Sequence, residues 1–565
     1  MLRLFREHEI RRCVPLDGRW EFVTAAQRRD RRKLPSRYVS SMQVPGVWES
    51  LPGLENYRGT AWLRTEVETH EDLALRLVFG GVSHTGTAFI DGRKVGSHYD
   101  AFTPWDCVVP RLGYGRRELV VEVDNSFGGH SALHRENDYY TYGGITRPVE
   151  AQYVPAVYIE RMLATPQRRG KKWELDVRVV LRNWSQSTAE RAIAIEIAGL
   201  DHQESLGGVI VPGNGTREVR RTLKGLSPEM WDSQSPKLYS ISVLLLDDGC
   251  PVDDLIDRIG FREVEVQGSR ILLNGQQLRL RGFNRHEDHP QFGCALPVAA
   301  MADDLEIMRD LGANFVRTSH YPNDMRFLDL CDELGMYVWE ESHARAVPFD
   351  QPAYREQITA STTEMVHWHH NRPSIIMWGC LNECESNTRA GCREHERVLK
   401  LLKRLDPSRP TTFASNKHRN DLCLGHVDIV AWNRYDAWYG GSPADVKPAL
   451  EEALAWLDSA ASKGGAGKPV IMSEFGAGAL SGNRQRCRAP WSEEYQCDAL
   501  DESLRVYLGH PRLSGSLVWQ FCDVRVTRGW WGRRPRTMNN KGVVDEYRRP
   551  KLAYDIVRKR MRKGS

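Results

Sequence analysis

The chain is 565 residues long and 41% hydrophobic, with 17 Trp, so it can form several domains with large cores and is not disordered. Its 78 basic and 74 acidic side chains leave a net charge of +4, which is too balanced to indicate a nucleic-acid partner. The twelve cysteines are scattered without a CxxC pair, a pattern typical of thiols kept reduced in a cytosol. The start lacks the apolar core of a signal peptide, and no run approaches the ~18 apolar residues of a membrane span. We therefore expect a cytoplasmic protein with no membrane partner.

Residues 1–155 and 156–265 are both predicted to be all-β domains. In the first, strand-like runs such as residues 73–79 alternate with turn clusters such as residues 91–93, which is typical of a jelly-roll β-sandwich. The second continues with runs such as residues 173–181, at the size and strand count of an immunoglobulin-like sandwich without its disulfide. It contains no candidate chemistry, so we expect it to act as a spacer.

From residue 266 to residue 565 the pattern changes to strand–helix alternation, which predicts a (β/α)8 barrel of the TIM type. A doubly wound sheet is the alternative, but no GxGxxG or phosphate loop follows the first strand. The predicted strands are 278–282, 314–317, 336–340, 374–378, 411–414, 429–433, 470–474 and 516–519. Helical periodicity is clearest at 303–311, 324–334, 394–405, 444–457, 494–508 and 550–561.

Two of these strands end close to a glutamate, Glu383 and Glu474. The apolar runs before them carry no charge and are about one strand long, as in buried parallel strands. Because a barrel keeps its active site at the carboxyl ends of its strands, the two carboxylates indicate acid/base and nucleophilic work on a glycosidic bond. The alternative is that both are strand-end glutamates in structural ion pairs.

Polar or aromatic residues stand at the ends of seven of the eight predicted strands, all but the fifth, as an active site on that face requires. His286, Glu287, Asp288 and His320 are residue types that bind metals. No HExxH-like spacing is present, however, so we expect neither a metal nor a cofactor.

An aromatic, glycine-bearing segment at residues 137–144 contains one acid, Asp138. Such a loop can reach out of the first domain and line a sugar site. The alternative is a tyrosine-rich edge that packs on the next domain.

Taken together, these motifs resemble glycoside hydrolase family 2, and within it the β-glucuronidases, over essentially the whole chain and in the same three-domain order. The matching motifs are residues 282–288 (GFNRHED), 317–322 (RTSHYP), 382–383 (NE), 473–476 (SEFG) and 491–496 (WSEEYQ). The resemblance implies that Glu383 is the general acid/base and Glu474 the nucleophile of a retaining hydrolysis without a cofactor. Retention requires carboxyls about 5–5.5 Å apart. It also implies that Asn382 hydrogen-bonds the sugar 2-hydroxyl.

For the substrate, the resemblance implies that Asn539 and Lys541 bind a sugar carboxylate, as an Asn-x-Lys does in β-glucuronidases. The other implied substrate-binding residues are Asp138, His320, Tyr435, Tyr439, Trp519 and, with a displaced spacing, Arg536. Two departures from the family pattern occur: Asp436 and Ala437 replace Tyr-Gly, and Pro535 occupies the position where an arginine is expected.

We therefore predict an exo-acting retaining β-glucuronidase that acts on a β-glycoside or oligosaccharide ending in a uronic acid, and that assembles as a homo-oligomer. A β-galacturonidase, a β-galactosidase or another exo-glycosidase on the same scaffold is the first alternative. A non-catalytic carbohydrate-binding protein is a more distant one.

Overall fold

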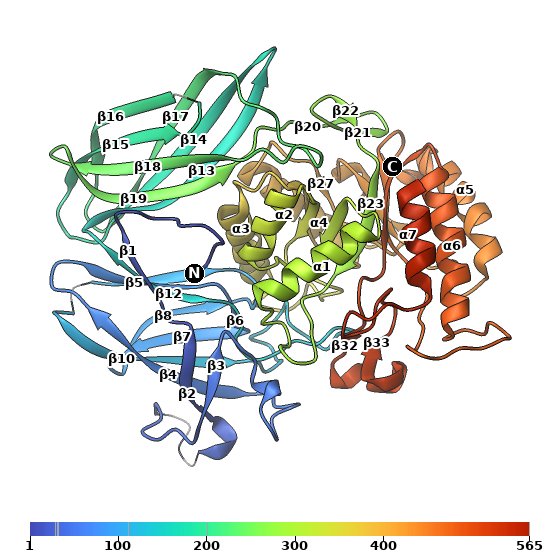
Figure 1. The fold of residues 1–565 in the computed structure, drawn as a ribbon, viewed down its shortest axis with the longest axis horizontal. Helices are drawn as coiled ribbons and strands as arrows, with labels where there is room; N and C mark the ends of the chain where they lie inside the picture. The colour runs from blue at the N-terminus through green and yellow to red at the C-terminus, as the bar shows by residue number, and fades with distance from the viewer. Residues whose placement is uncertain (29, 31–32, 111, 201, 564–565) are drawn as a thin grey trace.

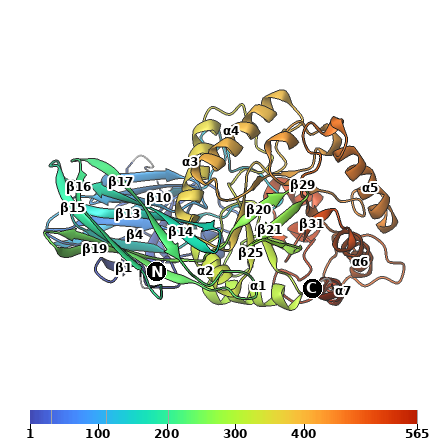
Figure 2. The same cartoon turned by 90° about the horizontal axis from the view of Figure 1, so that it is seen from above.

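A computed structural model describes residues 1–28, 30, 33–110, 112–200 and 202–563. Two β-sandwiches come first in the chain and lie beside a barrel formed by the second half, as both views show (Figure 1, Figure 2). The sandwiches carry only strands and short turns among their described residues, whereas all seven described α-helices belong to the barrel part.

The first sandwich packs a six-stranded antiparallel sheet, in the order β3-β2-β4-β10-β7-β8, against a four-stranded one, in the order β1-β12-β5-β9. Alternation along β10 explains the packing, because Leu119 and Val121 enter the core between the sheets while Val120 packs on the other face. A short pair, β6 with β11, lies beside them. The strands are β1 Arg12–Pro15, β2 Gly18–Thr24, β3 Ser40–Val44, β4 Thr60–Thr69, β5 Ala74–Phe79, β6 Val82–Ser83, β7 Thr85–Ile90, β8 Arg93–Tyr99, β9 Trp105–Val109, β10 Gly115–Asp124, β11 Gly144–Ile145 and β12 Val149–Val154.

The second sandwich pairs a three-stranded sheet, β13-β14-β17, with a four-stranded sheet, β16-β15-β18-β19. Its core is filled by alternate residues such as Ile193, Ile195 and Ile197, and it contains no disulfide because all twelve cysteines are free. A small sheet, β20-β21-β22, leads into the barrel. The strands are β13 Val157–Arg169, β14 Lys172–Asn183, β15 Ala189–Ile197, β16 His202–Val211, β17 Gly215–Leu226, β18 Tyr239–Asp247, β19 Cys250–Ile259, β20 Val264–Gln267, β21 Arg270–Leu273 and β22 Gln276–Gln277.

The barrel is a ring of parallel strands in the order β27-β26-β25-β24-β23-β31-β30-β29-β28. Its two ends, β27 and β28, are halves of one strand separated by Phe413, so the ring has the eight strands that the sequence predicts. The strands are β23 Leu280–Arg285, β24 Phe315–Thr318, β25 Tyr337–Glu341, β26 Ile375–Gly379, β27 Thr411–Thr412, β28 Ala414–Ser415, β29 Val430–Asn433, β30 Val470–Phe475 and β31 Leu513–Val518. A two-stranded ribbon, β32 Val524–Arg525 with β33 Met538–Asn539, follows them.

Seven helices cover the described barrel, and some of their ends carry recognisable caps. Asp324 accepts a hydrogen bond from the Arg326 amide at the start of α2, and Gly335 ends that helix at a φ of 69°, which favours glycine. The fifth strand is followed only by 3₁₀ turns, at His418–Asn420 and Leu424–His426. The helices are α1 Val298–Asp310, α2 Met325–Leu334, α3 Tyr354–His369, α4 Arg389–Leu405, α5 Val446–Leu457, α6 Glu493–Gly509 and α7 Ala553–Lys563.

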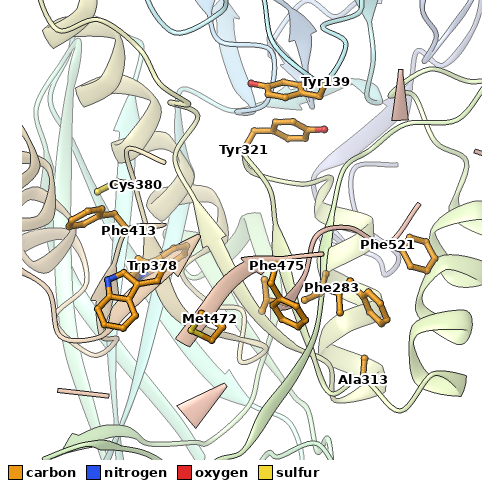
Figure 3. Close-up of a cluster of buried hydrophobic side chains, with 14 of the residues drawn as sticks. Tyr139, Phe283, Ala313, Tyr321, Trp378, Cys380, Phe413, Met472, Phe475 and Phe521 are labelled. Atoms are coloured by element: carbon orange, nitrogen blue, oxygen red, sulfur yellow. The ribbon is translucent and has the colours of Figure 1, made fainter. Parts of the chain in front are cut away.

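A large apolar core joins the barrel to the first sandwich. Figure 3 shows Phe283, Phe475 and Phe521 grouped on one side of this core and Tyr139 and Tyr321 at the top of the view. Tyr139 comes from the first sandwich, and its ring centroid lies 5.8 Å from that of Tyr321, which follows barrel strand β24. Each buried ring of this kind contributes about 1.5–3 kcal/mol, so the core fixes how the first sandwich meets the strand ends.

The predicted fold class, two β-sandwiches followed by a (β/α)8 barrel, is confirmed. The limits at residues 155/156 and 265/266 stay predictions. Among the described residues, no helix is both long and apolar enough to cross a membrane.

Candidate active site

Glu383 and Glu474 line one cavity of about 640 Å³ at the carboxyl ends of the barrel strands. Glu474 is the fifth residue of β30, and Glu383 follows the end of β26 by four residues. The backbone of Glu383 has a φ of 53°, which is uncommon for a residue with a side chain and is found mostly where function requires a strained position. The two glutamates therefore meet as the sequence predicts.

Arg317, at the third position of β24, is fully buried and connects the polar residues beneath the cavity. Its Nη1 lies 2.9 Å from Oε1 of Glu474, and its Nη2 lies 2.7 Å from Oε1 of Glu341. The same Nη2 donates to Oδ1 of Asn382 at 2.8 Å. The Nδ2 of Asn382 has no hydrogen-bond partner among the described residues, so this donor is available to a ligand.

Each glutamate also has a neutral hydrogen-bond donor. The hydroxyl of Tyr435 donates to Oε2 of Glu474 at 2.8 Å, and Nδ2 of Asn433 donates to Oε1 of Glu383 at 3.0 Å. Arg345 lies farther from Glu383, with 3.4 Å between Nη2 and Oε2. Glu474 is thus bound more tightly by donors, including one charged donor, than Glu383.

The two carboxyls share one buried space, which changes their protonation. Burial, together with the negative charge of Glu383, raises the pKa of the Glu474 carboxyl to about 8, although the hydrogen bonds from Arg317 and Tyr435 oppose this rise. Two like charges in one pocket cannot both ionise freely. The pair therefore holds one proton near neutral pH, as acid/base chemistry requires.

Asp138 reaches the cavity from the first sandwich and is held by two arginines. Its Oδ1 lies 3.2 Å from Nη2 of Arg345, and its Oδ2 lies 3.0 Å from Nη2 of Arg534. Burial raises the pKa of Asp138, but the two guanidiniums outweigh burial and lower it below its usual value. The segment is fixed on the barrel because the amide of Asn137 donates to Oγ1 of Thr527 at 2.7 Å.

Both interpretations of the 137–144 segment therefore hold. Its tyrosines, Tyr139, Tyr140 and Tyr142, are buried, while Asp138 lines the cavity. The segment packs on the barrel and also supplies a side chain to the site.

Lys541 is buried behind the cavity in a cage of aromatic rings. Its Nζ lies 5.1–5.8 Å from the ring centroids of Tyr435, Trp438 and Tyr439. It donates one hydrogen bond, to the hydroxyl of Tyr439 at 3.0 Å, and has no carboxylate within 4.0 Å among the described residues. Burial lowers the pKa of this ammonium. Lys541 is thus a buried cation with unused donors.

Asn539 belongs to strand β33 and lies beside Asp138. Its Nδ2 donates toward Oδ2 of Asp138 at 3.3 Å, and its Oδ1 has no partner among the described residues. Trp519 lines the cavity, and His320 stacks behind it with ring centroids 5.0 Å apart. His320 therefore supports the tryptophan wall and is not itself a wall of the cavity.

Arg536 is not brought to the cavity. Its side chain is half exposed and pairs with Glu546 at 3.0 Å. The backbone of Arg536 has a φ of 57°. Arg534, five residues before Asn539, is buried and lines the cavity in its place. The 3₁₀ turns across residues 528–537 rotate the chain, so the side chain three residues before Asn539 points away from the cavity.

The structure adds residues that the sequence argument did not assign. Arg345 lies four residues beyond the end of β25, in a stretch that carries no recognised motif, and Arg534, Trp530 and Arg533 lie in the turns before β33. A basic residue after a barrel strand was the available signal for Arg345. For the other three, no regular strand or helix links them to the site.

The alternative metal site at residues 286–288 does not form. His286 binds the hydroxyl of Tyr321 at 3.1 Å, Glu287 pairs with Arg147 at 2.9 Å, and Asp288 accepts from Tyr142 at 3.1 Å. Among the described residues, these groups do not converge with His320 on one point.

A barrel with two carboxylates in one cavity at its strand ends, one of them held by an arginine, is the arrangement of a glycoside hydrolase. The family model described as "Glycosyl hydrolases family 2, TIM barrel domain" matches residues 264–564, and "Glycosyl hydrolases family 2" matches residues 157–262. The chain therefore belongs to glycoside hydrolase family 2, as its motifs predict.

Named relatives align over the full length. A β-glucuronidase from Streptococcus agalactiae is 28% identical over 95% of this chain and 96% of its own. The structure of a β-galacturonidase from Eisenbergiella tayi bound to galacturonate has a TM-score of 0.94 and 42% identity, covering 100% of this chain and 99% of that one. A Ruminococcus gnavus β-glucuronidase in complex with D-glucaro-d-lactam has a TM-score of 0.85 and 26% identity, covering 99% of both chains.

Proposed function

We propose that this glycoside hydrolase is a retaining exo-β-uronidase that removes a terminal β-linked glucuronic acid. Glu474 is the nucleophile in this proposal, and Glu383 is the acid/base. The β-glucuronidases of Streptococcus agalactiae and Ruminococcus gnavus, which align over nearly the whole chain, support it. The charges described below support it independently.

In the first step, a carboxylate oxygen of Glu474 attacks the anomeric carbon while the bond to the glycosidic oxygen breaks. Glu383 gives its proton to that oxygen, which leaves as an alcohol. A water molecule then attacks the glycosyl ester, its proton passes to Glu383, and Glu474 leaves as a carboxylate. Each step uses the single proton that the pair holds.

The surrounding side chains support these roles. Arg317 and Tyr435 keep two donors on Glu474, which suits a group that begins and ends as an anion. The unpartnered Nδ2 of Asn382 suits a contact to the sugar 2-hydroxyl that strengthens in the transition state.

One observation carries the uronide assignment, namely the buried ammonium of Lys541, which no carboxylate of the described residues pairs with. A buried charge is costly unless it is paired. A sugar carboxylate placed against Nζ would supply the missing anion and accept the unused hydrogen bonds. The hydroxyl of a neutral sugar can accept a hydrogen bond but carries no negative charge, so the site favours a uronic acid.

A second candidate substrate is a β-galacturonide. The observation that favours it is the 42% identity, over the full length, with the Eisenbergiella tayi β-galacturonidase. Galacturonate and glucuronate share the carboxylate and differ at the 4-hydroxyl. Lys541 serves both, so only turnover of the two sugars separates the candidates.

The test is the initial rate of hydrolysis on nitrophenyl β-glucuronide, β-galacturonide, β-galactoside and β-glucoside, for the wild type and Lys541→Met. Loss of the buried charge pair is expected to cost about 2–4 kcal/mol on the preferred uronide, roughly 30- to 1000-fold in kcat/KM. Rates on neutral sugars should change little.

Arg536→Met is the matched control, because it removes one positive charge from the same segment outside the cavity. It is expected to leave the uronide rate unchanged. A preference for a neutral sugar together with an indifferent Lys541→Met would overturn the uronide assignment. Turnover of no glycoside at all would restore the carbohydrate-binding alternative.

We also propose that the enzyme works in the cytoplasm as a homo-oligomer. All twelve cysteines are free, which suits a reducing compartment. Light scattering after gel filtration measures the assembly, and a mass equal to one chain would contradict it.

A further inference from the structure

A second group of chemically active side chains lies where the first sandwich meets the barrel. It consists of Asp100, His134 and His343, here called the junction cluster. One ligand atom from each residue lies within 4.8 Å of the others, and all three residues are buried. Asp100 follows β8, His134 lies between β10 and β11, and His343 follows β25 by two residues. The cluster therefore joins three separate parts of the chain.

The carboxylate of Asp100 lacks a cationic partner. Among the described residues, its ion-pair contacts are Nε2 of His134 and Nδ1 of His343, each 3.9 Å from Oδ1. No arginine or lysine of the described residues pairs with this buried carboxylate, and such groups are normally paired or bound to a metal.

Two polar atoms of the cluster are also without hydrogen bonds. Oδ2 of Asp100 and Nδ1 of His343 have no partner among the described residues. Nε2 of His134 accepts a hydrogen bond from the Ala101 amide at 3.3 Å, which is long for such a bond. Asp100 also has a φ of 134°, an uncommon backbone conformation that favours glycine and occurs at functional positions. Oδ1 of Asp100, which faces both imidazoles, accepts from the Phe102 amide at 3.0 Å, so Oδ2 of Asp100 and Nδ1 of His343 are the unused ligand atoms of the cluster.

The outer nitrogen of each imidazole is already held by a tyrosine. The hydroxyl of Tyr99 lies 2.9 Å from Nδ1 of His134, and the hydroxyl of Tyr139 lies 3.1 Å from Nε2 of His343. Metal-binding histidines are commonly oriented in this way through their second nitrogen, and the metal would replace the long Ala101 contact to the inner nitrogen of His134. The hydrogen bonds that would orient the histidine ligands of a metal are therefore in place.

We propose that the junction cluster binds one divalent transition-metal ion, with zinc as the best match, through Asp100, His134 and His343. Two imidazoles and one carboxylate suit zinc and similar ions, whereas calcium and magnesium prefer oxygen ligands alone. Ligand atoms about 2.0–2.2 Å from zinc require the three side chains to draw inward slightly. The ion would supply the positive charge that Asp100 lacks.

The metal site would hold residues of the cavity wall in position without touching the substrate. His343 is two residues before Arg345, and Tyr139 directly follows Asp138. Arg345 and Asp138 form an ion pair in the cavity wall. A metal that fixes His343 and, through its hydroxyl contact, Tyr139 would hold that ion pair in place. Its three ligands also come from both the sandwich and the barrel, so it would fasten the two parts together.

The first test measures the metal content of the full chain by mass spectrometry, as purified and after incubation with zinc and gel filtration. The expected result is about one zinc per chain and a thermal midpoint that falls on chelation and recovers with zinc. Cobalt offered to the chelated protein should give visible absorption bands. Less than about one tenth of an equivalent under both conditions, with no thermal shift, would overturn the proposal.

Variants then locate the site. Asp100→Asn and His343→Gln should lose the bound zinc and its thermal effect, and should raise KM for the preferred glycoside more than they lower kcat. His367→Gln, which removes an imidazole outside the cluster, is the control and should retain both. Zinc retained at full stoichiometry by both cluster variants would contradict the assignment. If the variants do not fold, the wild-type zinc and cobalt measurements still decide the proposal.

Discussion

At the scale of single residues, Arg317 sets the charge balance of the site. One guanidinium contacts Glu474, Glu341 and Asn382, so two acids and an amide are fixed by one buried cation. Arginine suits this role because its planar head presents five donors in a fixed arrangement. Glu383 is held less closely by a cation, since the hydrogen bond from Arg345 is 3.4 Å long. This asymmetry stabilises the ionised form of Glu474 against the opposing effects of burial and the neighbouring charge.

A pH profile tests this asymmetry. Since burial and the charge of Glu383 raise the pKa of Glu474 to about 8, the wild-type kcat/KM should fall as the pH rises through that region and the pair loses its proton. In Glu383→Gln the neighbouring charge is gone, so the pKa of Glu474 should fall. The alkaline limb should then disappear, and the acid limb should remain, because it reports ionisation beside an uncharged neighbour in both enzymes.

Glu383→Gln should also depend on the leaving group. Hydrolysis of an unactivated alkyl glycoside should fall about 10²- to 10⁴-fold, whereas a nitrophenyl glycoside needs little protonation and should be affected less. Glu385→Gln, an exposed carboxylate two residues away, is the control. An alkaline limb that survives unchanged in Glu383→Gln would show that the limb belongs to another group.

The sequence predicts the residues that follow regular strands and misses those in turns. Glu383, Glu474 and Asn382 are predicted correctly as neighbours because a buried, uncharged strand fixes where its carboxyl end lies. Arg534 was not predicted, and Arg536 points away from the cavity, because 3₁₀ turns have no periodicity from which a side chain's direction can be read.

At the scale of elements, the 137–144 segment shows how a loop is held rigid. Gly143 lies so close to Trp48 that an added Cβ would come within 1.9 Å of the indole ring. Its amide also donates to Glu49 at 3.1 Å. The segment is therefore fixed at its end by close packing and at its start by Thr527, with Asp138 near the start.

Gly143→Ala should displace this segment. Overpacking of this kind costs about 1–3 kcal/mol, so the thermal midpoint should fall and KM should rise as Asp138 moves. Gly129→Ala is the matched control, because nothing lies within 4 Å of its added Cβ. Calorimetry and steady-state kinetics measure both effects, and equal midpoints for the two variants would contradict close packing at Gly143.

Elements were predicted best where burial is complete. The barrel strands agree with the predicted ones to within a few residues because most of them contain a short, buried apolar stretch. The fifth strand is an exception, since it is interrupted at Phe413 and is followed by 3₁₀ turns where the strand–helix alternation of a barrel predicts a helix. Tertiary packing decides such short segments, and the local sequence carries little of that information.

At the scale of the whole molecule, the three parts meet at a buried charge network near the N-terminus. Nη2 of Arg3 lies 2.8 Å from Asp257 in β19 and 3.1 Å from Asp329 in α2, so one side chain joins the second sandwich and the barrel. Asp329 also accepts from the Leu4 amide at 2.9 Å and pairs with Arg372. Contacts between residues more than 250 positions apart cannot be read from local patterns, which is why the sequence did not predict this network.

Arg3→Met should weaken this junction. Removing one partner of a buried ion pair leaves uncompensated charge and costs about 3–5 kcal/mol, so the thermal midpoint at pH 7 should fall by several degrees. Arg6→Met is the control, because Arg6 is exposed and, within the part of the chain that the structure describes, donates to the His8 carbonyl and not to a carboxylate. Scanning calorimetry on the full chain measures both variants, and equal midpoints would show that the network adds no stability.

The direction in which pH changes this stability follows from the pKa values of Asp329 and Asp257. Burial raises the pKa of Asp329, but Arg3 and Arg372 outweigh burial and hold it well below its usual value, and the pKa of Asp257 is lowered in the same way. The unfolded chain therefore binds protons more readily than the folded one, so this stability is complete above the unfolded pKa of about 3.9. It is lost as the pH falls toward the folded values. The gap between wild type and Arg3→Met should accordingly be widest above about pH 5 and should close in stronger acid. A gap that stays constant from pH 7 to pH 3 would mean that Arg3 acts through packing and not through its charge.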